Sequence, residues 1–250
     1  MDPEKTIYNN MIYKKSSSPI AQNLLLLKNY YHVDTNKKLL KAIIDDLLVS
    51  IFLFSGTGLF TGVIKGLIGR LLIKSGSPLI IGKRAKIMHP SNMHFGHHVW
   101  IRDDVTLAAN GKMKIGNDVV IGEKSTLWSD NKGLTIGDGV GIGRNCYIAQ
   151  LGGPIIIGGG VLIADTVRIY SLNHKYEDTT KPIPLQGYEE STIKIKDNVW
   201  IGSGAVIFNN VTVGTGSVIG ANTVVTKNVP DYVVFAGVPG KVIKKLKRKK

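Results

Sequence analysis

The side chains best suited to chemistry gather around one histidine. His174 stands in the sequence SLNHKYED and is followed by Tyr176, Glu177 and Asp178. An imidazole exchanges protons near neutral pH, so it can take the proton of a hydroxyl while that hydroxyl attacks a carbonyl carbon. Glu177, Asp178 or a main-chain carbonyl could orient the ring. The segment therefore predicts general-base catalysis, but a lone histidine is more often structural or simply exposed, so its setting must decide.

A period of six residues runs through the chain on both sides of this segment. Between Ile195 and Val225 an aliphatic residue returns at every sixth position, and groups of three such residues lie upstream from Phe95 onward. This period fits neither an α-helix nor an ordinary strand. Glycine follows ten of the apolar residues, which lets the backbone bend without a Cβ clash. We interpret each group of three as one triangular coil of a solenoid of short parallel strands with a narrow, filled interior.

The spacing places one long loop beside the histidine. Twenty extra residues, 175–194, interrupt the period between Ile169 and Ile195 and begin directly after His174. Long excursions from a rigid scaffold often carry function, and the alternative is a tolerated surface insertion. We expect His174 to point outward, at the corner where this loop leaves the coil.

Composition narrows the class of protein. The chain has 250 residues, 43% of them hydrophobic, which suffices for a substantial core. Its single cysteine, Cys146, excludes an internal disulfide framework, and we expect it to serve packing in a reducing compartment. The first twenty residues mix charged and polar groups without the apolar core of a cleavable signal, so we expect a cytoplasmic protein.

The formal charge of +14 is concentrated at the C-terminus, where the last ten residues carry seven basic side chains. We expect this run to be a solvated, frayed end. Attraction to a phosphorylated ligand, an anionic polymer or an anionic membrane surface is the alternative. Nucleic acid is disfavoured as a partner, because no aromatic residues alternate with the basic ones and no nucleic-acid-reading motif occurs.

Residues 1–78 lack the repeat and form a separate region that we expect to be mainly helical. The segment 39–48 has helix-like spacing, and the segment 47–64 contains no charge and approaches a membrane span in length. Small and polar residues dilute the second segment. We favour a helical cap over the open edge of the first coil. Peripheral membrane attachment is the second interpretation and a true span the third.

Several motifs carry a resemblance to a known family. They are the repeated I-G-x-x-x-x unit and the segments SLNHKYED, IKDNVWIGSGAVI, VTVGTGSVIGANTVVTKNVP and FAGVPGKVIKK. Over residues 80–245 the chain resembles the hexapeptide-repeat acyltransferases, and more narrowly the sugar O-acetyltransferases of the maltose and galactoside acetyltransferase type with their surface-polysaccharide relatives. The resemblance implies an all-β, left-handed parallel β-helix, an exception to the right-handed crossover rule. It also implies a homotrimer with active sites between the subunits.

The expected organisation is a helical N-terminal cap over 1–78, a β-helix over 79–230 with an active-site loop at 175–194, and a C-terminal extension with the basic tail over 231–250. The resemblance implies direct transfer of acetyl from acetyl-CoA to a sugar hydroxyl, in a surface polysaccharide or its precursor, with no metal. His174 falls on the family's catalytic histidine. A glycan or lipid-linked sugar acceptor fits a cytoplasmic location, with the inner face of the cell membrane as the alternative.

The resemblance also implies a site for the acetyl donor. The residues assigned to acetyl-CoA are Trp200, Gly202, Ser203, Ala221, Thr226, Lys227, Lys241 and Lys244. The first three fall near the thioester and pantetheine, the alanine offers a main-chain contact, and the last two lysines suit phosphate as point charges. The pantetheine arm would lie along the coil edges, much as a peptide adds to a sheet edge. The alternatives are ladder packing for Ala221 and a subunit-interface aromatic for Trp200.

The chain departs from the maltose and galactoside enzymes at their acceptor-binding positions. Ala149, Gly152 and Gly153 stand where that pattern has an asparagine and an acidic residue. We therefore expect the acceptor to be a different glycan or a lipid-linked precursor. The replacement candidates for contacts with it are Arg144, Gln150, Tyr176 and Tyr188.

Three other functions are consistent with parts of the sequence. A zinc carbonic anhydrase shares the expected architecture and needs three imidazoles around one metal. The candidates for that set are His89, His94, His97 and His98. Two of these are adjacent and point in different directions, so we expect no metal site. Transfer to an amino sugar would use the same donor site, and the sequence barely separates it from O-acetylation. A non-catalytic solenoid would have no reason to combine His174, its loop and Trp200.

Overall fold

The structure is a computed structural model that describes residues 35–38, 40–41, 44 and 72–247. Residues His174–Gly187 group apart from the solenoid. Helical backbone occurs at 36–38, 40–41 and 44, whereas most of the expected N-terminal cap and all of the uncharged segment 47–64 lie outside the described residues. Among those that are described, no helical segment has the length and hydropathy needed to span a bilayer.

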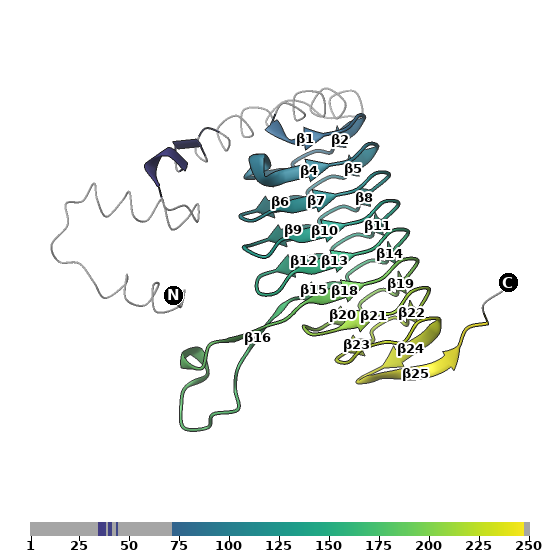
Figure 1. Ribbon diagram of the computed structural model, residues 1–250. Coiled ribbons are helices and arrows are strands. Elements are labelled where there is room, and N and C mark those ends of the chain that lie inside the picture. Colours follow the sequence, from purple (N-terminus) through teal and green to yellow (C-terminus); the bar gives the residue numbers. More distant parts are fainter. Residues whose placement is uncertain (1–34, 39, 42–43, 45–71, 248–250) are drawn as a thin grey trace. The chain divides into compact units, whose positions relative to one another are not determined.

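Short strands stack into three sheets, one for each side of the coil (Figure 1). Sheet A contains β1 (Lys74–Ser75), β4 (Met93–Phe95), β7 (Met113–Ile115), β10 (Leu134–Ile136), β13 (Ile155–Ile157), β18 (Ile193–Ile195) and β21 (Thr212–Val213). Sheet B contains β2 (Leu79–Ile81), β5 (Val99–Ile101), β8 (Val120–Ile121), β11 (Gly141–Ile142), β14 (Leu162–Ile163), β19 (Trp200–Ile201), β22 (Val218–Ile219), β24 (Val233–Gly237) and β25 (Gly240–Lys245). Sheet C contains β3 (Lys86–Met88), β6 (Thr106–Ala109), β9 (Thr126–Ser129), β12 (Tyr147–Gln150), β15 (Arg168–Tyr170), β20 (Val206–Ile207) and β23 (Val224–Val225).

The chain visits sheets A, B and C in turn, so each coil adds one strand to every sheet. Strands of neighbouring coils pair in parallel, and the aliphatic residues of the six-residue period face each other in register, as Ile121 faces Ile142 and Ile142 faces Ile163 in sheet B. These side chains are buried and form one continuous core. The expected all-β parallel solenoid is therefore confirmed, and its architecture is consistent with the left-handed form that the resemblance implies.

Polar side chains fix the corners between sheets A and B. Asp138 Oδ1 accepts a hydrogen bond from the N–H of Asn117 at 2.7 Å, and Asn117 Oδ1 accepts one from the N–H of His97 at 2.8 Å. Each bond joins a corner to the same corner of the next coil. Such bonds satisfy main-chain donors that the sheets leave unpaired, and they make the solenoid a rigid support.

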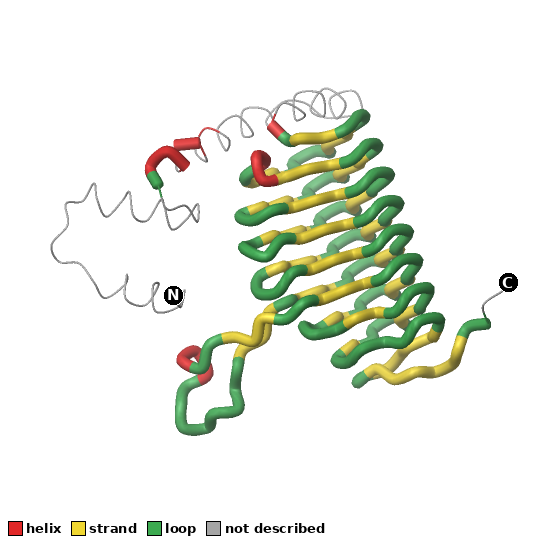
Figure 2. Tube along the Cα trace, viewed as in Figure 1, coloured by secondary structure: helices red, strands yellow, loops and turns green. Residues whose placement is uncertain are grey.

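The residues that exceed the six-residue period lie between the sheet C strand of one coil and the sheet A strand of the next, in the longer sheet C strands and the connections that follow them (Figure 2). These connections are 89–92, which includes η1 (Pro90–Asn92), then 110–112, 130–133, 151–154 and 171–192. The other two corners keep nearly constant lengths, because each departure from the coil length must bulge outward if the strands are to stay in register. One edge of the prism therefore carries a row of loops.

The C-terminal basic run is partly a strand and not a frayed end. β25 pairs antiparallel with β24 and extends sheet B by one strand. The N–H of Leu246 then donates to the carbonyl of Tyr232 at 2.7 Å. The expectation of a frayed end is wrong for 241–246, because these residues supply the main-chain partners that the edge of β24 needs.

Candidate active site

The excursion between β15 and β18 holds His174. β16 (Leu172–His174) pairs with β17 (Tyr188–Glu190), and η2 (Ile183–Leu185) lies between them along the chain. The paired segment therefore begins at Leu172, earlier than the boundary expected from spacing. His174 is exposed and ends β16, so it stands where the strand becomes the loop, as expected.

The loop after His174 is held by its own polar groups, with Asp178 at the centre. The Asp178 carboxylate accepts a hydrogen bond from the N–H of Thr180 at 3.0 Å and pairs with the Lys181 ammonium at 2.8 Å. The Gln186 side chain binds the main chain of the same residue: its Nε2 donates to the Asp178 carbonyl at 2.9 Å, and its Oε1 accepts from the Asp178 N–H at 3.0 Å. Lys181, followed by Thr180, lowers the pKa of the Asp178 carboxyl. This carboxylate therefore braces the loop.

The other acceptor candidates take different positions. Tyr176 lies on the loop with 63% of its surface exposed, and Tyr188 is half-buried at the start of β17. Arg144 lies on the solenoid surface, where its guanidinium and its main-chain N–H both donate to Asp165 at 2.8 Å. The same contacts lower the pKa of the Asp165 carboxyl and raise the pKa of Arg144. Arg144 is thus engaged in a surface ion pair.

Gln150 is not available to an acceptor, which corrects its assignment as a substrate contact. Its side chain is 0% exposed at the end of β12. Gln150 Oε1 accepts from the N–H groups of Asp130 and Gly133 at 2.7 and 3.0 Å, while Nε2 donates to the carbonyls of Gly152 and Gly153 at 2.8 and 3.3 Å. All of its hydrogen-bonding capacity is used in tying two loops of the C–A corner together.

Gly152 and Gly153 let the chain pass close to them where the excursion departs and where it returns. A Cβ on Gly153 would lie 2.3 Å from the main-chain carbon of Ser191, and one on Gly152 would lie 2.7 Å from the carbonyl oxygen of Ser171. Side chains at these two positions would collide with backbone. The glycines therefore serve the geometry of the corner, and no larger residue could replace them without moving the excursion.

Several residues assigned to the acetyl donor come together at the C-terminal end of sheet B. Trp200 is 50% exposed and faces Val218 in the next strand; Val218 faces Val234, and Val234 faces Lys244. An exposed indole, two half-buried valines and a lysine thus form one row across four strands. Lys241 faces Ala236 in the same hairpin, and both lysines are exposed.

The adjoining corner between sheets B and C contributes Ser203 and Ala221. Both are exposed, and the N–H of Asn222 donates to the carbonyl of Ser203 at 2.8 Å, which stacks the two corners. A Cβ on Gly202 would lie 2.6 Å from the Ala221 nitrogen, so only glycine permits this approach. The remaining pair, Thr226 and Lys227, is exposed just after β23 at the following corner.

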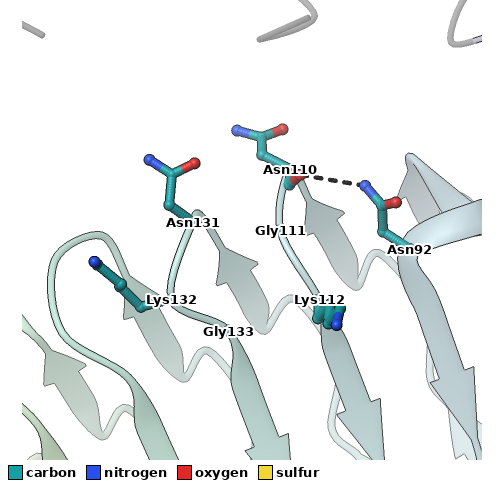
Figure 3. Close-up of a pocket in the computed structure, with 7 residues that line it drawn as sticks. All are labelled: Asn92, Asn110, Gly111, Lys112, Asn131, Lys132 and Gly133. Atoms are coloured by element: carbon teal, nitrogen blue, oxygen red, sulfur yellow. Dashed lines mark hydrogen bonds between the residues drawn. The ribbon is translucent and has the colours of Figure 1, made fainter. Parts of the chain in front are cut away.

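A second feature, not anticipated from the sequence, lies on the loop-bearing edge. It is a hollow of about 550 Å³, which we call the corner hollow (Figure 3). Its lining consists of Asn92, Asn110, Gly111, Lys112, Asn131, Lys132 and Gly133. The signal in the sequence is the pair of off-period segments NGK and DNKG, which place a lysine in each of two consecutive corner loops.

The histidines proposed for zinc do not converge. His97 Nδ1 contacts the main chain of Ser77, whereas His98 pairs with Asp118 at 3.1 Å. Within residues 72–247 and the few described before them, no three histidine, cysteine or acidic side chains are grouped so that they could hold a metal ion.

Comparisons with known proteins match the repeat. The protein-family model described as bacterial transferase hexapeptide (six repeats) matches residues 192–227. A second family model, described as the hexapeptide repeat of succinyl-transferase, matches residues 112–150. The chain is 31% identical over 153 residues to an Escherichia coli protein named as a lipopolysaccharide biosynthesis O-acetyl transferase, WbbJ, covering 58% of this chain and 78% of that one. It is 30% identical over 169 residues to the galactoside O-acetyltransferase of Escherichia coli, covering 68% and 71%.

One curated relative matches over a smaller share of its length, and two solved structures share the fold. The chain spans 44% of a Mycobacterium tuberculosis protein named as a probable acetyltransferase, with 36% identity over 137 residues, or 53% of this chain. Among solved structures, the polySia specific acetyltransferase NeuO gives a TM-score of 0.54 at 24% identity, covering 67% of this chain and 80% of that one. A variant of the Bacillus cereus N-acyltransferase AntD gives 0.53 at 24% identity, covering 73% and 89%. At these identities the two structures support the fold alone.

Proposed function

Because this chain belongs to the hexapeptide-repeat acetyltransferase family, we propose that it moves the acetyl group of acetyl-CoA to a sugar hydroxyl, in a surface polysaccharide or its precursor. The observation that carries the proposal is the position of His174. It is an exposed imidazole at the end of β16, the first strand of the excursion 171–192. The WbbJ and galactoside relatives, both named for O-acetyl transfer, support the choice of a hydroxyl.

In this proposal His174 is the general base. Its imidazole removes the proton of the acceptor hydroxyl as the oxygen bonds to the acetyl carbon, and it returns that proton to the thiol when the carbon–sulfur bond breaks. Acetyl-CoA supplies the activated acetyl group. Main-chain N–H groups at the coil edges are the donors best suited to the negative charge that develops on the carbonyl oxygen.

The residues at the end of sheet B fit the donor. Trp200 and the valines beside it offer apolar surface for a pantetheine arm, and Lys241 and Lys244 offer positive charge for phosphates. The stacked corners of Ser203 and Ala221 expose main chain beside them, which suits the amides of the arm. Thr226 and Lys227 extend the same end of the solenoid.

We further propose that the active enzyme is a homotrimer. Sheet B presents a stripe of outward apolar residues in register, in which Val120 is 39%, Leu162 56% and Trp200 50% exposed. Contiguous apolar surface of this kind favours association. A flat face on a three-sided prism suits packing around a threefold axis. The proposed trimer would place donor residues of one subunit beside a neighbouring subunit.

The test begins with purified protein, acetyl-CoA and a panel of polysaccharide repeat units, followed by mass spectrometry. A gain of one acetyl group that is lost under mild alkali identifies an ester, whereas an alkali-stable product identifies an amide on an amino sugar. His174→Ala should reduce transfer by at least 10³-fold and still bind CoA. His98→Ala, another exposed histidine, is the matched control. Full transfer by His174→Ala would defeat the assignment.

The donor site has its own test. Trp200→Ala should raise the acetyl-CoA concentration needed for half-saturation by about tenfold, because apolar contact with the arm is lost. Trp100 occupies the corresponding position of β5 in sheet B, where Arg102 lies 4.1 Å from its ring centre. Trp100→Ala is therefore the matched control. Unchanged saturation in Trp200→Ala would remove this residue from the site.

A further inference from the structure

The corner hollow contains side chains with nothing in the described structure to bind. Lys112 and Lys132 are exposed, and their ammonium groups make no hydrogen bond or ion pair with other described residues. The amides of Asn110 and Asn131 are likewise unengaged among those residues. Figure 3 shows the two asparagines and the two lysines on neighbouring loops of the same edge. The hollow therefore presents two positive charges and two polar amides to solvent.

The main chain around these side chains is fixed from beneath. Asn92 Nδ2 donates to the carbonyls of Ala109 and Asn110 at 2.8 and 3.2 Å, which holds the first loop. Ser129 Oγ donates to the carbonyl of Lys112 at 2.7 Å, and Gln150 Oε1 binds both ends of the second loop. A Cβ on Gly111 would lie only 1.7 Å from the carbonyl oxygen of Asp130, so the two loops are in direct contact. The main chain that carries the two lysines is therefore held in a fixed arrangement, and their flexible side chains extend from it.

The chemistry of the lining selects a class of ligand. Lysine ammonium groups bind carboxylate or phosphate oxygens as point charges, and asparagine amides both donate to and accept from hydroxyls. A sugar unit that carries a negative charge offers both kinds of group. The volume of about 550 Å³ lies within the range of ligand sites. Asp130, which is next to the hollow, takes part in an interaction within the protein and is not counted among the groups open to a ligand.

The hollow lies on the same corner of the solenoid at which the chain departs after Ser171. Its loops occupy successive turns of the C–A corner, and the excursion leaves the same corner two coils beyond Lys132, after Ser171. Strands in a sheet are about 4.8 Å apart, so this separation is about 10 Å along the axis. The intervening corner, 151–154, has the sequence LGGP and carries no charge. A glycan chain bound in the hollow would lie along this corner of the solenoid.

We propose that the corner hollow binds a negatively charged sugar unit of the acceptor glycan, away from the hydroxyl that is acetylated. This inference rests on the proposed function and narrows its substrate to an anionic polysaccharide. It also accounts for an acceptor site that differs from those of the maltose and galactoside enzymes.

Binding can be tested without acetyl transfer. The probes are an oligogalacturonate, whose sugar units carry carboxylates, and its fully methyl-esterified form, which has the same rings without charge. Calorimetry should detect binding of the acid form and little binding of the ester form. The affinity for the acid form should fall as salt is added. Lys112→Gln with Lys132→Gln should weaken binding at least tenfold, and Asn131→Ala should weaken it by a smaller factor.

The matched control is Lys124→Gln with Lys194→Gln, which removes the same charge from exposed positions outside the hollow. The control should bind the acid form like the wild type. The inference is overturned if the Lys112 and Lys132 variant binds like the wild type, if both probe forms bind equally, or if the wild type binds neither. The proposed function fails by a different result, which is the absence of acetyl transfer to every glycan in the panel.

Discussion

Gln150 and Ser171, which lie in successive coils, both hydrogen-bond the main chain of Gly152. Gln150 Nε2 donates to the carbonyl of Gly152 at 2.8 Å, and Ser171 Oγ accepts from the N–H of Gly152 at 3.3 Å. Both side chains are fully buried at the ends of sheet C strands. Ser171 directly precedes β16, so this contact fixes the point at which the excursion leaves the solenoid.

Gln150→Leu should lower the free energy of unfolding by about 2–4 kcal/mol, because the carbonyls of Gly152 and Gly153 lose their side-chain donor and the N–H groups of Asp130 and Gly133 lose one of their two acceptors. Denaturant unfolding followed by tryptophan fluorescence gives the value. Thr135→Leu is the control, since this exposed side chain of β10 should shift stability by less than about 0.5 kcal/mol. Equal stability of the two variants would show that the buried amide does not stabilise the corner.

Asp178→Asn should loosen the loop after His174 without altering the solenoid. The variant loses the ion pair with Lys181, so peptides covering 175–187 should exchange amide hydrogens faster at pH 7. Glu177→Gln is the control, because its exposed neighbouring carboxylate can be neutralised without removing that ion pair. Faster exchange in both variants would indicate that general charge, and not the Asp178 contacts, orders the loop.

The contacts of the Asp178 carboxylate also predict how the protection of the loop depends on pH. The folded loop lowers the pKa of the Asp178 carboxyl, so its stabilising contribution is complete above the ordinary carboxyl pKa of about 3.9 and is lost as pH falls through the lower folded value. Protection of the loop, corrected for intrinsic exchange, should be equal at pH 7 and pH 5. It should decline only in more acidic solution. A loss of protection already at pH 5 would contradict the assignment.

Cys146 should react slowly with thiol reagents in the native protein. Its side chain is 1% exposed, Sγ lies 3.1 Å from the carbonyl oxygen of Ala164, and burial raises the pKa of the thiol. Labelling should be at least 100-fold slower than in denatured protein. The raised pKa stabilises the fold below the ordinary thiol pKa of about 8.5, and this contribution is lost at higher pH. Rapid native labelling would place the thiol at the surface.

The repeat could be predicted from sequence because its cause is local. Every aliphatic residue of the period, such as Ile142, must point inward for the coil to close, so the pattern predicts the strands and core together. The place of His174 followed from the same count, since the excursion is the only interruption of that size in the period.

The roles of Gln150 and the C-terminal lysines depend on contacts that spacing does not encode. From sequence alone, a glutamine at the end of a strand is expected to lie at the surface. In the structure, loops of two coils close over Gln150 and bind its side chain. The turn after Gly237 reverses the chain and makes β25 antiparallel, whereas the period stops at Val225 and predicts no structure for the residues beyond it. The corner hollow is missed for the same reason, because it forms between loops that are distant in sequence.

Leu162→Lys should disrupt the proposed trimer, because it places a charge in the apolar stripe of sheet B, where Leu162 faces Trp200 of the next coil. Sedimentation velocity should show smaller species at concentrations where the wild type is assembled, with a dissociation constant raised at least 100-fold. Ile156→Lys is the matched control: Ile156 is 38% exposed on sheet A, between Thr135 and Lys194. Assembly that survives Leu162→Lys and fails in Ile156→Lys would place the subunit interface on sheet A. In that case Trp200 would face solvent, and its apolar row would be free along its length for the acetyl donor of the same subunit.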